Sequence, residues 1–517
     1  MATKHSVILI ILDGWGIGNP DFTNPIHTVN PPNINYIKSN FPSGALQASG
    51  IAVGLPWGEE GNSEVGHLNM GAGKILYQNY PRITLSIRDG SFFLNKVLND
   101  AFQHAKENNS NVNLIGLLTE ANVHASFEHL EALIQFAEKE NFPKERLNLH
   151  LITDGRDSPP KSAMELIERL PDKNQLASIS GRYYTMDRDN HWDRIKLSYN
   201  MLIGNGPITD DFEAHIKKTY EKNLNDEYVL PTLIGPKKRA IQENDSIIFF
   251  NFREDRMKEI VKTFIDKDFD KFETKKFSNL HVITMIGYDT SFTVPIISPP
   301  DNIETPLSKV LSDNGKNQWR IAETEKYAHI TYFFNGQREE PFPNEYRVLI
   351  PSKTEFKYDQ HPEMRAEEIT TRLLEAIQEK AYDFILVNFA NADIIAHTGN
   401  FKATVEAIKI LDEEIGKIMK TALDNDAYLL ITADHGNAER LINPQTGEAE
   451  TKHDASPVPI YLIANEFKRE RSPEEVRQGE KAPVGVLADI GPTILELMGV
   501  PKPKEMSAQS LLELLLD

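Results

Sequence analysis

Six side chains that could bind metal ions stand in short polar segments of this 517-residue chain. The expected ligand sets are Asp13, Asp434 and His435 for one ion, and Asp393, His397 and His453 for the other. Carboxylate oxygens mixed with imidazole nitrogens suit Mn²⁺ or Zn²⁺ and contain too much nitrogen for a calcium site. We therefore expect a centre that holds two divalent ions.

Each Asp–His pair taken alone has a simpler interpretation, a capped turn or a surface ion pair, because the chain contains 15 histidines. Their positions favour metal binding. Asp13, Asp393 and Asp434 each follow an apolar run of strand length, and the carboxyl ends of parallel strands are where such sheets bind ligands. Asp393 and His397 are four residues apart and would share one face if that segment is helical.

Ser63, in the segment GNSEVGHLNMGAG at 61–73, is a candidate nucleophile. It does not lie in a G-x-S-x-G elbow, because Gly61 and Val65 stand two residues before and after it. A serine hydroxyl needs a base or a metal to remove its proton, and two ions roughly 3.5–4 Å apart could also hold a transferring phosphoryl group. A glycine-rich loop that enters a helix, with Ser63 as its cap, is an equally open alternative.

Five arginines form a second candidate group: Arg156, Arg182, Arg188, Arg253 and Arg256. In a chain with a net charge of −20 they could provide the local positive field that an anionic substrate needs. Arg253 and Arg256 are three residues apart and could share a helix face that grips a carboxylate or phosphate. The alternative is that the arginines pair with neighbouring acids, namely Asp187, Glu254 or Asp255.

Three further residues stand near these groups in the sequence. Asp157 could act as a general acid or base beside Arg156, or could be an ordinary turn carboxylate. His124 could add a hydrogen bond to a bound anion, although a single loop histidine is commonly incidental. Lys326 follows Glu325 and would ordinarily form a surface ion pair with it.

Short apolar runs that alternate with amphipathic stretches must position these residues. They lie at 7–12, 113–118, 147–152, 246–250, 281–286, 383–387, 427–432 and 459–463. Continuous hydrophobicity within such short runs is typical of strands covered on both faces. We therefore predict an α/β fold with two mainly parallel sheets.

The length of the chain exceeds that of one ordinary domain. Proline-rich polar stretches at 77–83 and 297–306 are the expected linkers around an inserted domain. We predict a discontinuous domain of residues 1–78 and 302–517 that carries the metal ligands and Ser63, and an inserted domain of residues 79–301 that carries the arginines. The chemistry would then lie between the domains.

The composition of the chain argues against several classes of binding partner and against export. The net charge of −20 argues against nucleic acid and anionic membranes as partners. The chain has no cysteine, and its first apolar run of six residues is too short for a signal peptide or a membrane span. We expect a cytoplasmic protein that acts on a small molecule.

Taken together, the motifs resemble those of cofactor-independent phosphoglycerate mutases of the alkaline phosphatase superfamily, over essentially the whole chain. The matching segments are LDGWG, GNSEVGHLNMGAG, HASFEHL, ITDGRDSPP, SGRYYTMDRDNHWDR, NFREDR, EKYAHITYFFNG, ADIIAHTGN, TADHGNAE and KHDASPVP. After Asp393 the family commonly has a Met-Val-Gly type run, whereas this chain has Ile394, Ile395 and Ala396. The ligand spacing is intact.

The resemblance implies an alkaline-phosphatase-like domain with two divalent ions, Mn²⁺ first and Co²⁺, Zn²⁺ or Mg²⁺ as alternatives. It adds Ser63 to the ligands of the ion held by Asp13, Asp434 and His435. The residues implied to surround the substrate are His124, Arg156, Asp157, Arg182, Arg188, Arg253, Arg256 and Lys326, of which Asp157 and Lys326 would be catalytic together with Ser63.

The implied reaction is the interconversion of 3-phosphoglycerate and 2-phosphoglycerate through a phosphoserine at Ser63, with Asp157 moving the protons and without bisphosphoglycerate as cofactor. We expect a monomer. A metal-dependent phosphate-ester hydrolase would share the metal ligands and Ser63 but would not need the arginines, and a non-catalytic phosphate-binding protein would leave Ser63 and Asp157 without a purpose.

Overall fold

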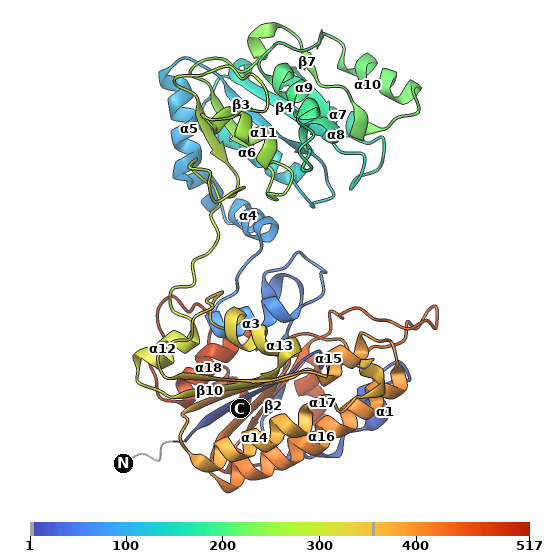
Figure 1. Cartoon of the computed structure of the whole chain (residues 1–517), viewed down its shortest axis with the longest axis vertical. Helices are drawn as coiled ribbons and strands as arrows, with labels where there is room; N and C mark the ends of the chain where they lie inside the picture. The colour runs from blue at the N-terminus through green and yellow to red at the C-terminus, as the bar shows by residue number, and fades with distance from the viewer. Residues whose placement is uncertain (1–4, 354–356) are drawn as a thin grey trace. The chain divides into compact units, whose positions relative to one another are not determined.

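The computed structural model describes residues 5–353 and 357–517 of the chain. The chain divides into two compact units (Figure 1), unit 1 with Met1–Gln78 and Asp301–Asp517, and unit 2 with Asn79–Pro300. The sequence predicts the two domain boundaries between residues 78 and 79 and between residues 301 and 302. Each unit has its own apolar core.

Unit 1 contains an eight-stranded sheet in the order β11-β10-β12-β1-β13-β14-β2-β15. Its strands are β1 Val7–Leu12, β2 Ser43–Gln47, β10 Gln318–Glu323, β11 Glu345–Ile350, β12 Phe384–Phe389, β13 Tyr428–Thr432, β14 Val458–Ile463 and β15 Pro483–Val486. Within the described sheet only β14 runs antiparallel to its neighbours. All six residues of β1 are buried, as expected for a central strand covered on both faces.

Helices cover both faces of this sheet (Figure 1). On one side lie α1 Pro25–Val29, α2 Pro32–Asn40, α14 Ala366–Glu379, α16 Phe401–Asp424 and α17 Pro473–Lys481. On the other lie α3 Ser63–Ala72, α12 Leu307–Asp313, α13 Thr324–Ala328 and α18 Ile490–Leu497. The short helices α15 Asn391–Ala396 and α19 Leu512–Leu516 complete the unit, and a π-helical turn at His329–Phe333 continues α13.

Unit 2 contains a seven-stranded sheet in the order β6-β7-β5-β4-β3-β8-β9. Its strands are β3 Val112–Leu118, β4 Leu147–Thr153, β5 Leu176–Gly181, β6 Ile208–Thr209, β7 Thr232–Ile234, β8 Ser246–Phe249 and β9 His281–Thr284. The five strands from β5 to β9 in this order are parallel, and β7 pairs antiparallel with β5. The predicted α/β class with two mainly parallel sheets is confirmed.

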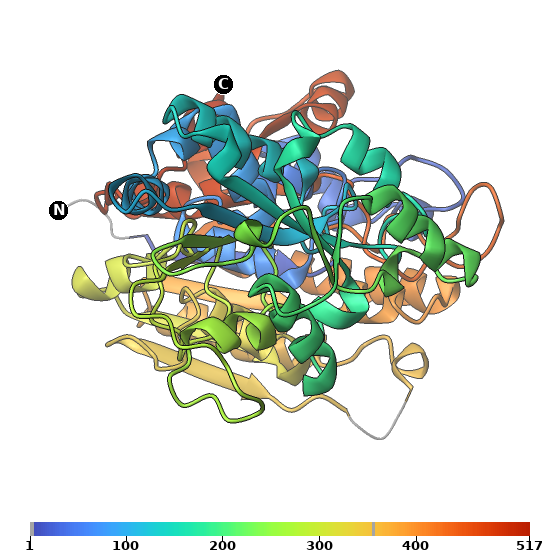
Figure 2. The ribbon, with the colours of Figure 1, turned by 90° about the horizontal axis from the view of Figure 1, so that it is seen from above.

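Helices also lie on both sides of the strands of unit 2 (Figure 2). They are α4 Asn79–Arg88, α5 Lys96–Glu107, α6 Phe127–Lys139, α7 Ala163–Glu168, α8 Arg182–Thr185, α9 Trp192–Leu202, α10 Phe212–Glu221 and α11 Lys258–Ile265. The prediction of a linker at 77–83 is wrong for most of its length, because α4 begins at Asn79 and buries Pro81 and Ile83. Among the described residues, no helix combines the length and the apolar character that a membrane crossing requires.

Candidate active site

The expected metal ligands of unit 1 are brought together beyond the carboxyl ends of three neighbouring parallel strands. Asp13 directly follows β1, Asp393 lies in α15 after β12, and Asp434 follows β13. Ser63 is the first residue of α3 and is buried. Asn62, whose side chain accepts a hydrogen bond from the Val65 backbone N–H, caps this helix, so the alternative role of Ser63 as the cap is wrong.

Ser63 lies at the centre of the first ligand set. Its Oγ is 2.9 Å from His435 Nε2 and 3.3 Å from Asp13 Oδ1. The same His435 nitrogen lies 3.4 Å from Asp434 Oδ2 and 3.6 Å from Asp13 Oδ1. All four expected ligands of the first ion therefore converge on one point.

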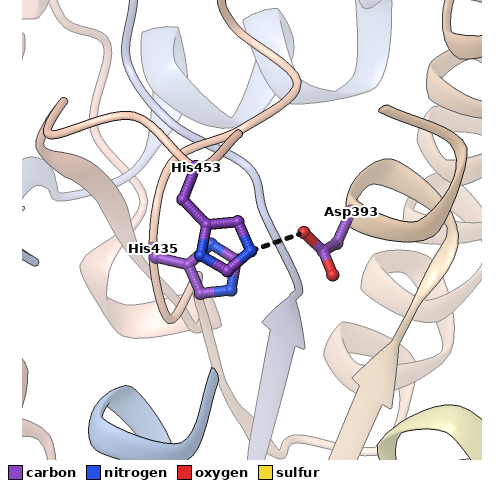
Figure 3. A group of neighbouring side chains, drawn as sticks. All are labelled: Asp393, His435 and His453. Carbon is purple, nitrogen blue, oxygen red and sulfur yellow. Dashed lines mark ion pairs between the residues drawn. The ribbon is translucent and has the colours of Figure 1, made fainter. Parts of the chain in front are cut away.

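The second ligand set is equally tight. Asp393 Oδ1 is 3.2 Å from His397 Nε2 and 3.5 Å from His453 Nε2, and the two imidazole nitrogens are 3.1 Å apart. Figure 3 shows His453 pointing at Asp393, with the His435 ring of the first set beside it. The rings of His435 and His453 stack with centroids 3.8 Å apart, so the two sets adjoin each other.

Lys326 joins the two sets. Its ammonium group is 2.5 Å from Asp13 Oδ1 and 2.7 Å from Asp393 Oδ2, and it donates a hydrogen bond to Ser63 Oγ at 2.8 Å. The side chain is buried, so the alternative of a surface ion pair with Glu325 is wrong. Burial lowers the pKa of Lys326, but the attraction of the neighbouring carboxylates outweighs it and holds the pKa above its usual value.

The buried side chains of the site carry more negative than positive charge, and divalent ions would neutralise the difference. Three buried carboxylates, Asp13, Asp393 and Asp434, face the single ammonium of Lys326. Burial and the nearby Asp434 raise the pKa of Asp13. At Asp393, burial raises the pKa, but Lys326 and the hydrogen bonds with His397 and His453 together outweigh it and hold the pKa well below the usual value. Asp434 Oδ2 has no hydrogen-bond partner among the described residues.

The histidine tautomers also fit metal binding. His397 Nδ1 lies 2.8 Å from the Thr451 carbonyl oxygen and His453 Nδ1 lies 2.8 Å from that of Gly61. Donation to these carbonyls places the proton of each neutral ring on Nδ1 and leaves both Nε2 lone pairs facing Asp393. Two such lone pairs 3.1 Å apart cannot bond to each other, and a cation between them satisfies both.

Sequence reasoning missed three residues that hold the ligands in place. Asn388 Nδ2 donates to Asp13 Oδ2 at 2.8 Å and to His67 Nε2 at 3.0 Å. His67 in turn contacts the Ser63 carbonyl oxygen through Nδ1 at 2.8 Å, and burial lowers its pKa to about 4. Asn437 Nδ2 donates to Asp393 Oδ1 at 2.8 Å. Only the i, i+4 spacing of Ser63 and His67 could have indicated such a role.

In unit 2, the structure brings Arg182, Asp157 and His124 close together. Arg182 is buried, and its Nη1 lies 2.5 Å from Asp157 Oδ2 and 2.6 Å from Asp154 Oδ1. His124 Nε2 lies 3.8 Å from Asp157, and its Nδ1 lies 3.4 Å from Asp255. Burial and the positive charge of Arg182 lower the pKa of His124 to about 4, so this imidazole is neutral near pH 7.

The other four arginines have looser contacts. Arg188 and Arg253 are near Asp255 at 3.0 Å and 3.5 Å, as the ion-pair alternative anticipated. Arg156 lies 3.8 Å from Glu227, and Arg256 donates to the Met186 carbonyl at 3.2 Å. A cavity of about 280 Å³ within unit 2 is lined by Arg156, Arg182, Arg188, Arg194 and Arg256 among others. Arginine side chains gathered around a cavity suit a small anion with several oxygen atoms.

Comparison with known proteins agrees with this chemistry. Residues 5–502 match the family described as Metalloenzyme superfamily. The 2,3-bisphosphoglycerate-independent phosphoglycerate mutases of Clostridium botulinum (strain Langeland) and Ectopseudomonas mendocina are 45% and 40% identical to this chain; each alignment spans 99% of the chain and 100% and 99% of the relative.

A solved structure of phosphoglycerate mutase from Leishmania mexicana, at low cobalt concentration, is also similar. It has a TM-score of 0.52 and 26% identity, over 98% of this chain and 97% of that chain. The chain belongs to the 2,3-bisphosphoglycerate-independent phosphoglycerate mutase family.

Proposed function

We propose that the chain interconverts 3-phosphoglycerate and 2-phosphoglycerate by passing the phosphoryl group through Ser63. The observation that carries this proposal is the position of Ser63 Oγ, which contacts Lys326, His435 and Asp13 within 2.8–3.3 Å in a buried site. No glycine elbow or classical Ser-His-Asp arrangement is needed for such a nucleophile when metal ions are present.

Two divalent ions, with Mn²⁺ as the first candidate and Co²⁺, Zn²⁺ or Mg²⁺ as alternatives, would stabilise the deprotonated serine and the charge of the transferring phosphoryl group. Asp13, Ser63, Asp434 and His435 would hold one ion. Asp393, His397 and His453 would hold the other. The excess of buried carboxylates and the two facing Nε2 lone pairs support this assignment.

Lys326 acts in this scheme as a fixed cation. The neighbouring carboxylates raise its pKa, so the side chain is an ammonium group in the metal-free site and donates a hydrogen bond to Ser63 Oγ. This hydrogen bond orients the nucleophile and stabilises negative charge on that oxygen. The neutral His67, which contacts the Ser63 carbonyl, fixes the first turn of α3.

Asp157 donates a proton to the glycerate oxygen that loses the phosphoryl group, and it accepts a proton from the glycerate hydroxyl that receives the group. Arg182 holds its Oδ2 at 2.5 Å, which orients the carboxylate, and the neutral His124 lies beside it. Arg156, Arg188, Arg253 and Arg256 bind the carboxylate and phosphate of the substrate. This grip keeps the glycerate bound after its phosphoryl group has left, which a mutase requires and a hydrolase does not.

The test is ³¹P NMR of the purified protein with 3-phosphoglycerate and Mn²⁺ and without added bisphosphoglycerate. We expect the 2-phosphoglycerate resonance to appear while inorganic phosphate stays constant. Release of inorganic phosphate as the main product would instead support a metal-dependent phosphate-ester hydrolase. A spectrum unchanged over hours, with metal shown to be bound, would contradict both activities.

A further inference from the structure

Glu439 is a buried carboxyl in unit 1 that the proposed reaction does not use. Its side chain is 1% exposed. Its Oε2 accepts hydrogen bonds from the backbone N–H groups of Gly16 at 3.0 Å and of Asn437 at 2.8 Å. Among the described residues, Glu439 forms no ion pair with a lysine or arginine, and the two backbone hydrogen bonds offset part of the cost of its burial.

Three glycines form the pocket that admits this side chain. A Cβ atom at Gly16 would lie 2.2 Å from Glu439 Cδ, and one at Gly436 would lie 2.3 Å from its Oε1. A Cβ atom at Gly18 would lie 2.8 Å from Glu439 Cγ. Any larger residue at these positions would displace the carboxyl, so the local sequence is fitted to it.

The hydrogen bonds of Glu439 connect the segments that carry the proposed metal ligands. Gly16 lies three residues after Asp13, in the loop that leaves β1. Asn437 lies two residues after His435, in the loop that leaves β13, and its side chain donates to Asp393 Oδ1 at 2.8 Å. One carboxyl therefore contacts both loops and, through Asn437, reaches the third ligand segment.

We infer that Glu439 is a positioning residue that fixes the ligands of both proposed metal ions by tying the loop after β1 to the loop after β13. This inference rests on the metal ligands proposed above. It goes beyond them because, among the described residues, no hydrogen bond or ion pair joins Glu439 to an expected ligand side chain or to Ser63.

The burial of Glu439 is unfavourable in itself, which argues that the contact is kept for geometry. Burial, with the nearby Asp454 carboxylate, raises the pKa of Glu439 to about 7. An apolar residue of similar size would avoid this cost, but it could not accept the two N–H bonds. Groups that hydrogen-bond to the ligand shell commonly change metal affinity about 10–100-fold when they are removed.

The experiment compares Glu439→Ala, Glu439→Gln and Glu439→Asp with the unmodified protein. Mn²⁺ affinity is measured by isothermal titration calorimetry on chelator-treated protein, together with the thermal midpoint of the metal-free form and kcat/KM at rising Mn²⁺. Alanine removes both bonds, and aspartate is one methylene too short to reach Gly16. We expect both variants to bind Mn²⁺ about 10–100-fold more weakly, and excess Mn²⁺ to restore most of the activity.

Glutamine keeps the length and one carbonyl oxygen that can accept both N–H bonds, so its Mn²⁺ affinity should stay within about threefold of the original. Asp412→Ala is the matched control. Asp412 is also buried in unit 1 and accepts backbone N–H bonds, from Asn33 at 3.0 Å and Ile34 at 2.9 Å. This control should lower the thermal midpoint and leave the Mn²⁺ affinity unchanged.

Two outcomes would overturn the inference. Unchanged Mn²⁺ affinity in a folded Glu439→Asp or Glu439→Ala protein would show that the bonds do not position the ligands. An equal loss of Mn²⁺ affinity in Asp412→Ala would show that general destabilisation is the cause. Asp434→Ala separates this result from the proposed function: if that variant also keeps its metal, the ligand assignment itself is wrong.

Discussion

Replacing Lys326 by methionine should make the stability of unit 1 depend strongly on divalent metal. The ammonium group lies 2.5 Å from Asp13 and 2.7 Å from Asp393, and both carboxylates are buried. Methionine keeps most of the volume of the lysine stem and removes only the charge. Without metal, three buried carboxylates would then face no ammonium group.

The size of the effect follows from these distances. At an effective dielectric constant of about 20, each contact contributes roughly 6 kcal/mol of attraction, most of which offsets the cost of burying the ions. Removing one partner of a buried pair typically costs about 3–5 kcal/mol. At about 2 °C per kcal/mol for a unit of this size, the metal-free variant should melt roughly 6–10 °C lower than the unmodified protein.

Added Mn²⁺ should reduce this difference, because ions that bind only the native state stabilise it and neutralise the same carboxylates. The assay is differential scanning calorimetry of both proteins after chelator treatment and again at saturating Mn²⁺. Lys417→Met is the control, since Lys417 pairs with the buried Glu414 at 2.7 Å but is half exposed. Its loss should stay below about 1 kcal/mol and should not depend on metal.

Equal destabilisation of the Lys326→Met protein with and without Mn²⁺ would refute the reasoning, because the ions would then not share the carboxylates of Lys326. The same variant should also lose about 10²–10³-fold in kcat, since its bond to Ser63 Oγ at 2.8 Å is removed. Near-normal turnover would remove Lys326 from the catalytic residues.

Three further predictions concern the nucleophile, the arginines and pH. Ser63→Ala should abolish isomerisation while the fold remains, and mass spectrometry of quenched reactions should find phosphate on Ser63 in the unmodified protein; phosphate found only elsewhere would contradict the intermediate. Arg253→Ala, at a half-exposed side chain that forms an ion pair with Asp255, should lose roughly 2–5 kcal/mol of transition-state binding, which lowers kcat/KM, and should keep its metal, whereas Asp434→Ala should lose both; a loss of metal in the arginine variant would argue against separate roles. The hydrogen bond with Asp393 raises the pKa of His397. Burial lowers the pKa of His453, but Asp393 and the Gly61 carbonyl together outweigh it and raise that pKa as well. Protons therefore compete with metal at these nitrogens, and both Mn²⁺ affinity and activity should fall as pH decreases through the raised values; a pH-independent Mn²⁺ affinity would be inconsistent with these ligands.

The strands that could be predicted from the sequence are the ones that form a largely apolar run of residues. The run at 7–12 coincides with β1, and the other seven predicted runs match strands to within two residues at each end. β10, with the sequence QWRIAE, was missed although all its residues are buried. Arg320 explains this: its guanidinium is fully buried, donates to the Ile330 carbonyl and lies 3.5 Å from Glu345, so the sequence of a buried strand next to the edge of the sheet has a polar pattern.

The residues of the candidate site could be predicted where two of them lie close together in the sequence. Asp434 and His435 adjoin a strand end, and Asp393 and His397 share one helical turn. Lys326 could not be found in this way. Its partners lie 67 and 263 residues away in the sequence, and the adjacent Glu325 suggested an ordinary ion pair. Only the fold, or the resemblance to a family, brings such a residue into the site.

The resulting site departs from the rules that govern the rest of the core. Elsewhere in unit 1 the strands bury mainly apolar side chains, whereas at the ends of β1, β12 and β13 three carboxylates are buried with one ammonium group. Their environments differ: burial and Asp434 raise the pKa of Asp13, whereas at Asp393 the effect of burial is outweighed by Lys326 together with the hydrogen bonds of His397 and His453, which lower the pKa. Such an arrangement costs stability in the absence of cations. A large apolar core can compensate for this cost. The unbalanced negative charge favours the binding of divalent metal, and the hydrogen bonds of Lys326 and His435 orient Ser63 within the site.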